Sequence, residues 1–280
     1  MKVDKLFIYP VKSTAGIEVA QAEVTPTGLL NDRIWMLVDE RGKFVSQRQL
    51  PKMALISSKL EVDSLQLYAP DMEALKVPFE QSGNPLINVK VWRDDCQGIL
   101  ANDVINQWLS EFLEHKVRLV KYDFDAPRAT DPEYSKPGDI VSYADGFPLL
   151  ITNRSSLDDL NSRLQQPVTM SAFRPNIVIQ GAEAYSEDNW NQITIGTMTF
   201  DVVKPCARCL MTTIDPETGI KRSDGEPLKT LAQYRKKELH KKGLSEKDSD
   251  KKEIGIFFGM NLIPSRQGCI GVGDKVTIAH

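Results

Sequence analysis

The chain has 280 residues and a formal net charge of −3, so its charge balance gives no argument for a nucleic-acid partner or for attraction to an anionic membrane. No stretch approaches the roughly 20 apolar residues that a membrane-spanning helix needs, and the apolar run at the start is too short for a signal peptide. With four cysteines, we expect a cytoplasmic protein with reduced thiols, bound neither to nucleic acid nor to a membrane.

The first 122 residues are typical of short β-strands separated by turns. We expect one helix at Ala101–Leu113, where apolar residues recur at helical spacing and Asn102 or Asp103 can cap the first turn. We expect strands at Lys5–Ile8, Gly16–Val24, Ile34–Val38, Phe44–Ser46, Met53–Leu60, Leu65–Tyr68, Leu86–Trp92 and Lys116–Tyr122. Short strands at this spacing favour a small barrel or sandwich.

A stretch rich in Asp, Pro, Lys and Gly follows at Asp123–Asp139, and we place a domain boundary there. The two predicted domains are residues 1–122 and residues 123–280. Beyond the boundary we expect helices at Ser155–Leu164, capped by Ser155 or Ser156, and at Pro227–Lys242. The stretch Asp145–Ile151 leads into the first of these helices, and we expect strands at Arg174–Ile179, Ile193–Ile195, Met198–Val203, Ile254–Leu262 and Val276–Ile278.

Neither half of the sequence shows the strict βαβ alternation or the glycine-rich motif of a nucleotide-binding fold. The predicted fold is therefore mostly β, of the α+β class. It has a small N-terminal domain resembling a β-barrel, followed by a second β domain with a few helices.

Two cysteines, Cys206 and Cys209, follow the apolar run Met198–Val203 and precede the β-like run Leu210–Ile214. They are expected on a loop between two strands of a hairpin. A structural zinc site needs about four ligands, but the sequence has no second C-x-x-C and its three histidines are scattered. A thioredoxin-like motif should open a helix, whereas β-branched residues follow here. Two further interpretations of the cysteine pair stay open. Both thiols could be half-buried and without a role, or one could be a thiolate ligand to a soft, redox-active metal.

Four motifs occur in order along the chain. They are Tyr9-Pro-Val-Lys-Ser13, Asn31-Asp-Arg-Ile-Trp35, Phe173-Arg-Pro-Asn-Ile-Val-Ile179 and Cys206-Ala-Arg-Cys209. Together they resemble the MOSC-domain proteins that carry an N-terminal MOSC β-barrel, a family that includes the mitochondrial amidoxime reducing components and their bacterial relatives. The resemblance runs from about Lys5 to Ile278, which is nearly the whole chain, and it implies a MOSC N-terminal β-barrel before a MOSC β-barrel domain.

The resemblance implies an oxidoreductase that depends on the molybdenum cofactor, Mo-molybdopterin. It implies that Cys209 is the metal ligand and the catalytic residue, and that the cofactor also contacts Lys12, Ser13, Arg33, Arg174 and Asn176. These types suit the cofactor, because arginine and lysine bind phosphate and asparagine can both donate to and accept from a pterin edge. Each could instead form an ordinary salt bridge, and for Arg33 the neighbouring Asp32 makes a local ion pair a fair alternative.

The implied reaction is the reduction of small N-hydroxylated compounds, such as amidoximes, hydroxamic acids and N-hydroxylated bases. No cysteine cluster of a ferredoxin domain follows the last predicted strand, so we expect a separate electron donor of the ferredoxin, flavoprotein or cytochrome type. The charged run Lys236–Lys252 is expected to be a solvated helix end and loop, with a docking surface for a protein partner as the alternative.

Two other classes of function stay open beside the reductase. One is a carrier that holds sulfur as a persulfide on Cys209 and delivers it to metal–sulfur sites. The other is a binding module without enzyme activity. The sequence also departs from the family pattern, since Ala207 stands where a serine is frequent and Gly146-Phe147 stands where small hydroxyl residues occur.

Overall fold

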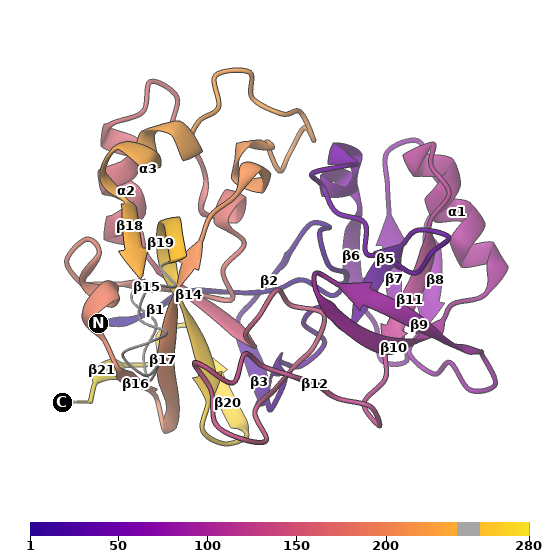
Figure 1. Cartoon of the computed structure of the whole chain (residues 1–280), viewed down its shortest axis with the longest axis horizontal. Helices are drawn as coiled ribbons and strands as arrows, with labels where there is room; N and C mark the ends of the chain where they lie inside the picture. Colours follow the sequence, from indigo (N-terminus) through magenta and orange to yellow (C-terminus); the bar gives the residue numbers. More distant parts are fainter. Residues whose placement is uncertain (240–252, 280) are drawn as a thin grey trace, which may run out of the picture.

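The structure is a computed structural model that describes residues 1–239 and 253–279. Figure 1 shows two lobes side by side. We call the lobe formed mainly by residues 34–122 the small lobe, and the lobe that contains the largest sheet the large lobe. Each lobe has its own buried core, the small lobe around Trp35, Leu37 and Leu119, and the large lobe around Leu6, Ile151 and Phe200.

The small lobe contains two antiparallel sheets and one helix. The helix α1 (Asp103–Leu113) packs against β8 (Leu75–Pro78) and β11 (Arg118–Tyr122). Its N-cap is Asn102, as predicted, because the Asn102 side chain accepts a hydrogen bond from the Ile105 amide. One sheet has the order β5 (Trp35–Val38), β11, β10 (Asp94–Leu100) and β9 (Leu86–Val91), and the other has the order β6 (Ser57–Leu60), β7 (Ser64–Tyr68) and β8.

The large lobe is built on a nine-stranded sheet in the described part of the chain. The order of its strands is β2 (Ile17–Val19), β1 (Lys2–Ile8), β15 (Ile177–Gln180), β14 (Leu149–Asn153), β19 (Glu253–Pro264), β17 (Met198–Ala207), β16 (Gln192–Ile195) and β21 (Val276–Ile278), with β18 (Lys236–Leu239) paired to β19. Two smaller sheets join β20 (Gly268–Gly271), β3 (Gln21–Thr25) and β4 (Gly28–Leu29), and β12 (Arg128–Ala129) with β13 (Ile140–Val141). The lobe also carries the helices α2 (Arg154–Ser162) and α3 (Leu228–Tyr234).

The predicted mostly β fold of the α+β class is confirmed. The division into residues 1–122 and 123–280 stays a prediction, and the structure adds a finding to it. β1 and β2 come from the first 122 residues, yet they lie in the sheet of the large lobe, where Leu6 of β1 is opposite Ile177 of β15. The chain therefore starts in the large lobe, forms the small lobe and returns.

The prediction of a hairpin loop around the two cysteines was wrong. β17 continues to Ala207, so Cys206 lies within the strand. The stretch after Cys209 is not a strand but a short 3₁₀ helix, η4 (Leu210–Thr213). The Thr212 and Thr213 hydroxyls donate to the carbonyls of Cys209 and Leu210, at 2.9 and 2.7 Å. These local hydrogen bonds outweigh the β propensity of the two threonines.

Three other expected elements differ in their type or bounds. Met53–Leu60 opens as the 3₁₀ helix η1 (Pro51–Leu55), because Pro51 fixes the first turn, and only its end is a strand. α2 is capped by Asn153 rather than by Ser155 or Ser156. The helix expected at Pro227–Lys242 ends at Tyr234, and most of the charged run Lys236–Lys252 lies outside the described residues. None of the described helices is long and apolar enough to cross a bilayer.

Candidate functional site

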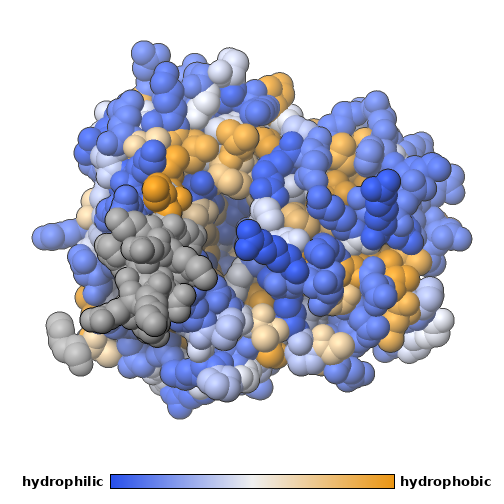
Figure 2. All heavy atoms as spheres, in the orientation of Figure 1, coloured by the Kyte–Doolittle hydropathy of each residue, from blue (hydrophilic) through white to orange (hydrophobic). Residues whose placement is uncertain are grey.

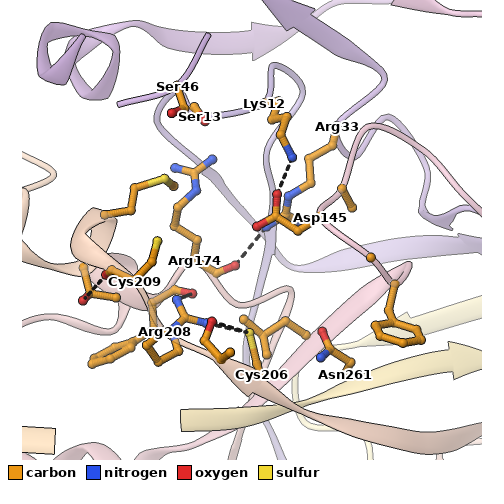
Figure 3. Close-up of a pocket in the computed structure, with 18 of the residues that line it drawn as sticks. Lys12, Ser13, Arg33, Ser46, Asp145, Arg174, Cys206, Arg208, Cys209 and Asn261 are labelled. Atoms are coloured by element: carbon orange, nitrogen blue, oxygen red, sulfur yellow. Dashed lines mark hydrogen bonds and ion pairs between the residues drawn. The ribbon is translucent and has the colours of Figure 1, made fainter. Parts of the chain in front are cut away.

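A cavity of about 110 Å³ lies where the two lobes meet, and we call it the inner cavity. Figure 2 shows the surface hollowed between the lobes, and Figure 3 shows the cavity in close-up. The small lobe contributes Phe44, Ser46, Arg48 and Trp92 to its wall. Cys206 also lines the cavity. So does every residue that the sequence predicted for the site, namely Lys12, Ser13, Arg33, Arg174, Asn176 and Cys209. The structure thus brings the four motifs together, while the roles of these residues stay predictions.

Backbone strain is concentrated around the inner cavity. Among the described residues, eight that are not glycine have a positive φ, and four of them line this cavity. They are Ser13 (φ 67°), Arg33 (φ 51°), Trp92 (φ 57°) and Arg174 (φ 55°). Such conformations are uncommon for residues with a Cβ and cluster at ligand sites.

Lys12 is buried, and its ammonium group faces two oxygens. It donates to the Tyr143 carbonyl at 2.7 Å and to Oδ1 of Asp145 at 2.5 Å. Burial lowers the pKa of Lys12, and the charge of Asp145 acts against this shift. Desolvation raises the pKa of the Asp145 carboxyl, but the attraction of Lys12 outweighs it and holds that pKa well below its usual range. Sequence reasoning missed Asp145, since a single aspartate in a loop carries no motif.

Arg33 forms the local ion pair that was the alternative to a cofactor contact. Its Nη1 lies 2.6 Å from Oδ2 of Asp32, whose side chain is fully buried. Arg33 also donates to the Arg174 carbonyl at 3.0 Å and to Oδ1 of Asn176 at 3.1 Å. The Asn176 side chain further accepts from the Leu150 amide and donates to the Phe7 carbonyl. Arg33 and Asn176 therefore shape the wall of the cavity through bonds within the protein.

Arg174 is different, because no carboxylate among the described residues pairs with it. Its guanidinium lies over the Tyr9 ring at 4.2 Å, and Nη1 donates to the Thr14 carbonyl at 2.5 Å. Nη2 is buried and has no hydrogen-bond partner within the described chain. Burial, together with the charge of Arg33, lowers the pKa of Arg174 to about 10. A half-buried cation with a buried donor that has no partner is an unfavourable arrangement unless an anion reaches it.

The two cysteines have different surroundings. Sγ of Cys206 accepts a hydrogen bond of 2.9 Å from Nη1 of Arg208, which also donates to the Phe173 carbonyl at 2.7 Å. Cys209 is exposed on the cavity wall, and its thiol has no hydrogen-bond partner among the described residues. In Figure 3 its sulfur points into the space below Arg174. No cluster of three or more metal-ligating side chains of the zinc-site type occurs in residues 1–239 and 253–279.

The donor set of the inner cavity suits an anionic group that also carries a soft metal. The wall has five cationic side chains and a single carboxylate within the described part of the chain, Asp145. Two buried nitrogens, Nη2 of Arg174 and Nε of Arg208, have no partner in that part. A phosphate would satisfy such donors, and a thiolate is a preferred ligand of soft metals. The residues present therefore fit a phosphorylated metal cofactor.

Comparison with known proteins gives matches along nearly the whole of this chain. The model of the MOSC N-terminal beta barrel domain matches residues 1–116, and that of the MOSC domain matches residues 138–277. The chain is 39% identical to mitochondrial amidoxime-reducing component 1 of Mus musculus, with 98% of this chain and 81% of that protein covered. It is 39% identical to the same protein of Danio rerio, over 98% and 83%, and 36% identical to mitochondrial amidoxime reducing component 2 of Homo sapiens, over 98% and 82%. The cytoplasmic location stays a prediction.

Proposed function

We propose that this chain is a molybdenum-cofactor-dependent reductase of N-hydroxylated compounds. The premise is that the chain belongs to the MOSC-domain family, which includes the mitochondrial amidoxime-reducing components. The observation that carries this proposal is that one cavity holds both the Arg174 guanidinium, whose Nη2 has no partner in the described chain, and the Cys209 thiol, which has no hydrogen-bond partner there. The first suits the phosphate of the cofactor, and the second suits the metal.

When bound, the cofactor supplies the two-electron chemistry that removes oxygen from an N–OH group. The chain's own residues hold and orient it. Cys209 is the ligand to the metal, and Arg174 and Arg208 offer their free N–H groups to anionic oxygens. Ser13 adds a hydroxyl to the same wall, and Lys12 adds a positive charge already fixed by Asp145.

Substrate and electron donor follow from the same premise. The substrate is a small N-hydroxylated molecule such as an amidoxime, hydroxamic acid or N-hydroxylated base. The electrons come from a separate donor protein of the ferredoxin, flavoprotein or cytochrome type.

A sulfur carrier is the second candidate, because an exposed thiol without a partner could also hold a persulfide. Metal analysis separates the two. We expect about one molybdenum per chain, and a pterin, in protein purified from a host that makes the cofactor. Well-folded protein with neither, but with a labile sulfur on Cys209, would contradict the reductase and favour the carrier.

A further inference from the structure

A second cavity of about 840 Å³ adjoins the inner cavity, and we call it the outer cavity. The two share part of their lining, so the shared residues form the neck between them. These residues are Phe44, Arg48, Trp92, Asp145 and Gly146. A molecule that reaches the thiols and arginines from the outer cavity must pass this neck, and the roles assigned above leave Trp92 and Arg48 unused.

Trp92 occupies an unfavourable backbone position. It is the first residue of the two-residue turn between β9 and β10, where Val91 pairs with Asp94, and its φ is 57°. Glycine or asparagine is usual at such a position, because a positive φ strains a residue with a bulky side chain. Trp92 is 43% exposed, and its ring packs on the Phe44 ring at 5.0 Å between centroids, so it lies at the edge of the cavity and not inside a core. Strain held at an exposed aromatic ring beside a cavity points to a ligand.

Asp145 offers a free acceptor next to this ring. Nε1 of Trp92 donates to Oδ1 of Asp145 at 3.1 Å, and Lys12 donates to the same oxygen. Oδ2 has no partner among the residues that the structure describes, and the side chain is 73% exposed. A carboxylate oxygen open to a cavity, beside an aromatic face, is suited to an N–H donor on a planar group.

Arg48 shows what kind of group this face accepts. Its guanidinium lies over the Trp92 ring at 4.2 Å. It is held there weakly, because its side-chain hydrogen bond within the described chain is a 3.4 Å contact from Nε to the Ser46 hydroxyl, and no carboxylate of that part pairs with it. The Arg48 guanidinium, a planar N–C–N group, therefore stacks on Trp92 and can be displaced by a ligand with a similar group.

We infer that Trp92 and Asp145 form a recognition subsite for the planar N–C–N head of an amidoxime or N-hydroxyguanidine. The head replaces the Arg48 guanidinium on the Trp92 ring, and its NH₂ group donates to Oδ2 of Asp145. This inference rests on the proposed function and narrows its substrates. A hydroxamic acid has a carbonyl in place of that NH₂ group, so an acceptor would face an acceptor, and the subsite therefore favours the amidoxime over the hydroxamic acid.

The test is a calorimetric titration of the purified holoenzyme with benzamidine, which has the N–C–N head of a product, and with benzamide as the matched control. We expect benzamidine to bind at least about tenfold more tightly than benzamide, since a hydrogen bond to a charged group is worth that much. Trp92→Gly and Asp145→Asn should each weaken benzamidine binding about tenfold. Arg48→Ala should strengthen it severalfold, because it removes the group that competes for the ring.

Thermal unfolding separates recognition from a structural role for Trp92. Trp92→Gly should leave the melting temperature unchanged or raise it, because glycine relieves the strain at positive φ. A clear fall in melting temperature together with unchanged benzamidine binding would assign Trp92 to the fold and overturn the inference. Equal binding of benzamide, or weaker binding of benzamidine to Arg48→Ala, would overturn it as well.

Turnover then distinguishes failure of the subsite from failure of the proposed function. For a working reductase we expect a higher kcat/KM for benzamidoxime than for benzhydroxamic acid. Asp145→Asn should reduce this preference mainly through KM, with rates expressed per bound molybdenum because Asp145 also fixes Lys12 beside the cofactor. Equal kcat/KM for both substrates in the wild type would contradict the subsite alone. A protein that binds benzamidine as expected but reduces neither compound would contradict the reductase and leave the subsite standing.

Discussion

Replacing Cys209 with alanine is expected to reduce bound molybdenum to less than about a tenth of the wild-type amount and to abolish N-hydroxyl reduction. The thiol of Cys209 is exposed in the inner cavity and has no partner in the described chain, so it is available as a ligand. A thiolate is a strong ligand for such a metal, and alanine offers none. The measurements are elemental analysis for molybdenum and turnover of benzamidoxime with a chemical reductant.

Cys206→Ala is the matched control, because it removes a thiol from the same cavity. Sγ of Cys206 already accepts a hydrogen bond from Arg208, so we expect this variant to keep most of its molybdenum and a substantial part of its activity. The ligand assignment would be wrong if Cys206→Ala lost the metal and Cys209→Ala kept it.

Arg174→Gln is expected to weaken the binding of the phosphate group about tenfold to a hundredfold, as the loss of one charged hydrogen bond does. The same change should alter the stability of the cofactor-free protein little. It removes a cation–π contact with Tyr9 and the hydrogen bond to the Thr14 carbonyl, but it also removes a half-buried charge that lacks a carboxylate partner among the described residues. Both effects are measured on cofactor-free protein. Calorimetric titration with inorganic phosphate measures anion binding, and urea unfolding measures stability.

Arg33→Gln provides the contrast for Arg174→Gln. Arg33 pairs with the fully buried Asp32, so its loss leaves a buried carboxylate uncompensated, at a cost of about 3–5 kcal/mol in the free energy of unfolding. We therefore expect Arg33→Gln to destabilise the protein strongly and Arg174→Gln to affect mainly anion binding. Equal losses of stability in both variants, with phosphate binding retained in Arg174→Gln, would contradict an anion site at Arg174.

Local sequence patterns were enough to predict the elements that are held by hydrogen bonds between residues close together in the chain. The cap of α1 at Asn102 and the strands β16 and β17 are examples. β10 was missed because it begins with two aspartates and contains Gly98, which reads as a turn. The structure shows why glycine is required there, since a Cβ at Gly98 would lie 2.5 Å from the Tyr143 hydroxyl. A contact between residues so far apart leaves no local signal.

The candidate site shows the same division. The six predicted residues come from motifs, and all six line one cavity, while their roles stay predictions. Asp145 and Trp92 were missed, because their importance depends on which side chains the two lobes bring together. One signal was present for Trp92, namely a large aromatic residue at the end of a strand, where a turn residue such as glycine is usual.

The most direct test of the central claim is the reduction of benzamidoxime by molybdenum-loaded protein, with protein from a host that lacks the cofactor as the control. The account predicts that benzamidine forms with one equivalent of two-electron reductant consumed per product, at a rate proportional to molybdenum content. The cofactor-free protein should be inactive. No benzamidine from fully loaded, folded protein, or equal rates with and without molybdenum, would contradict the account.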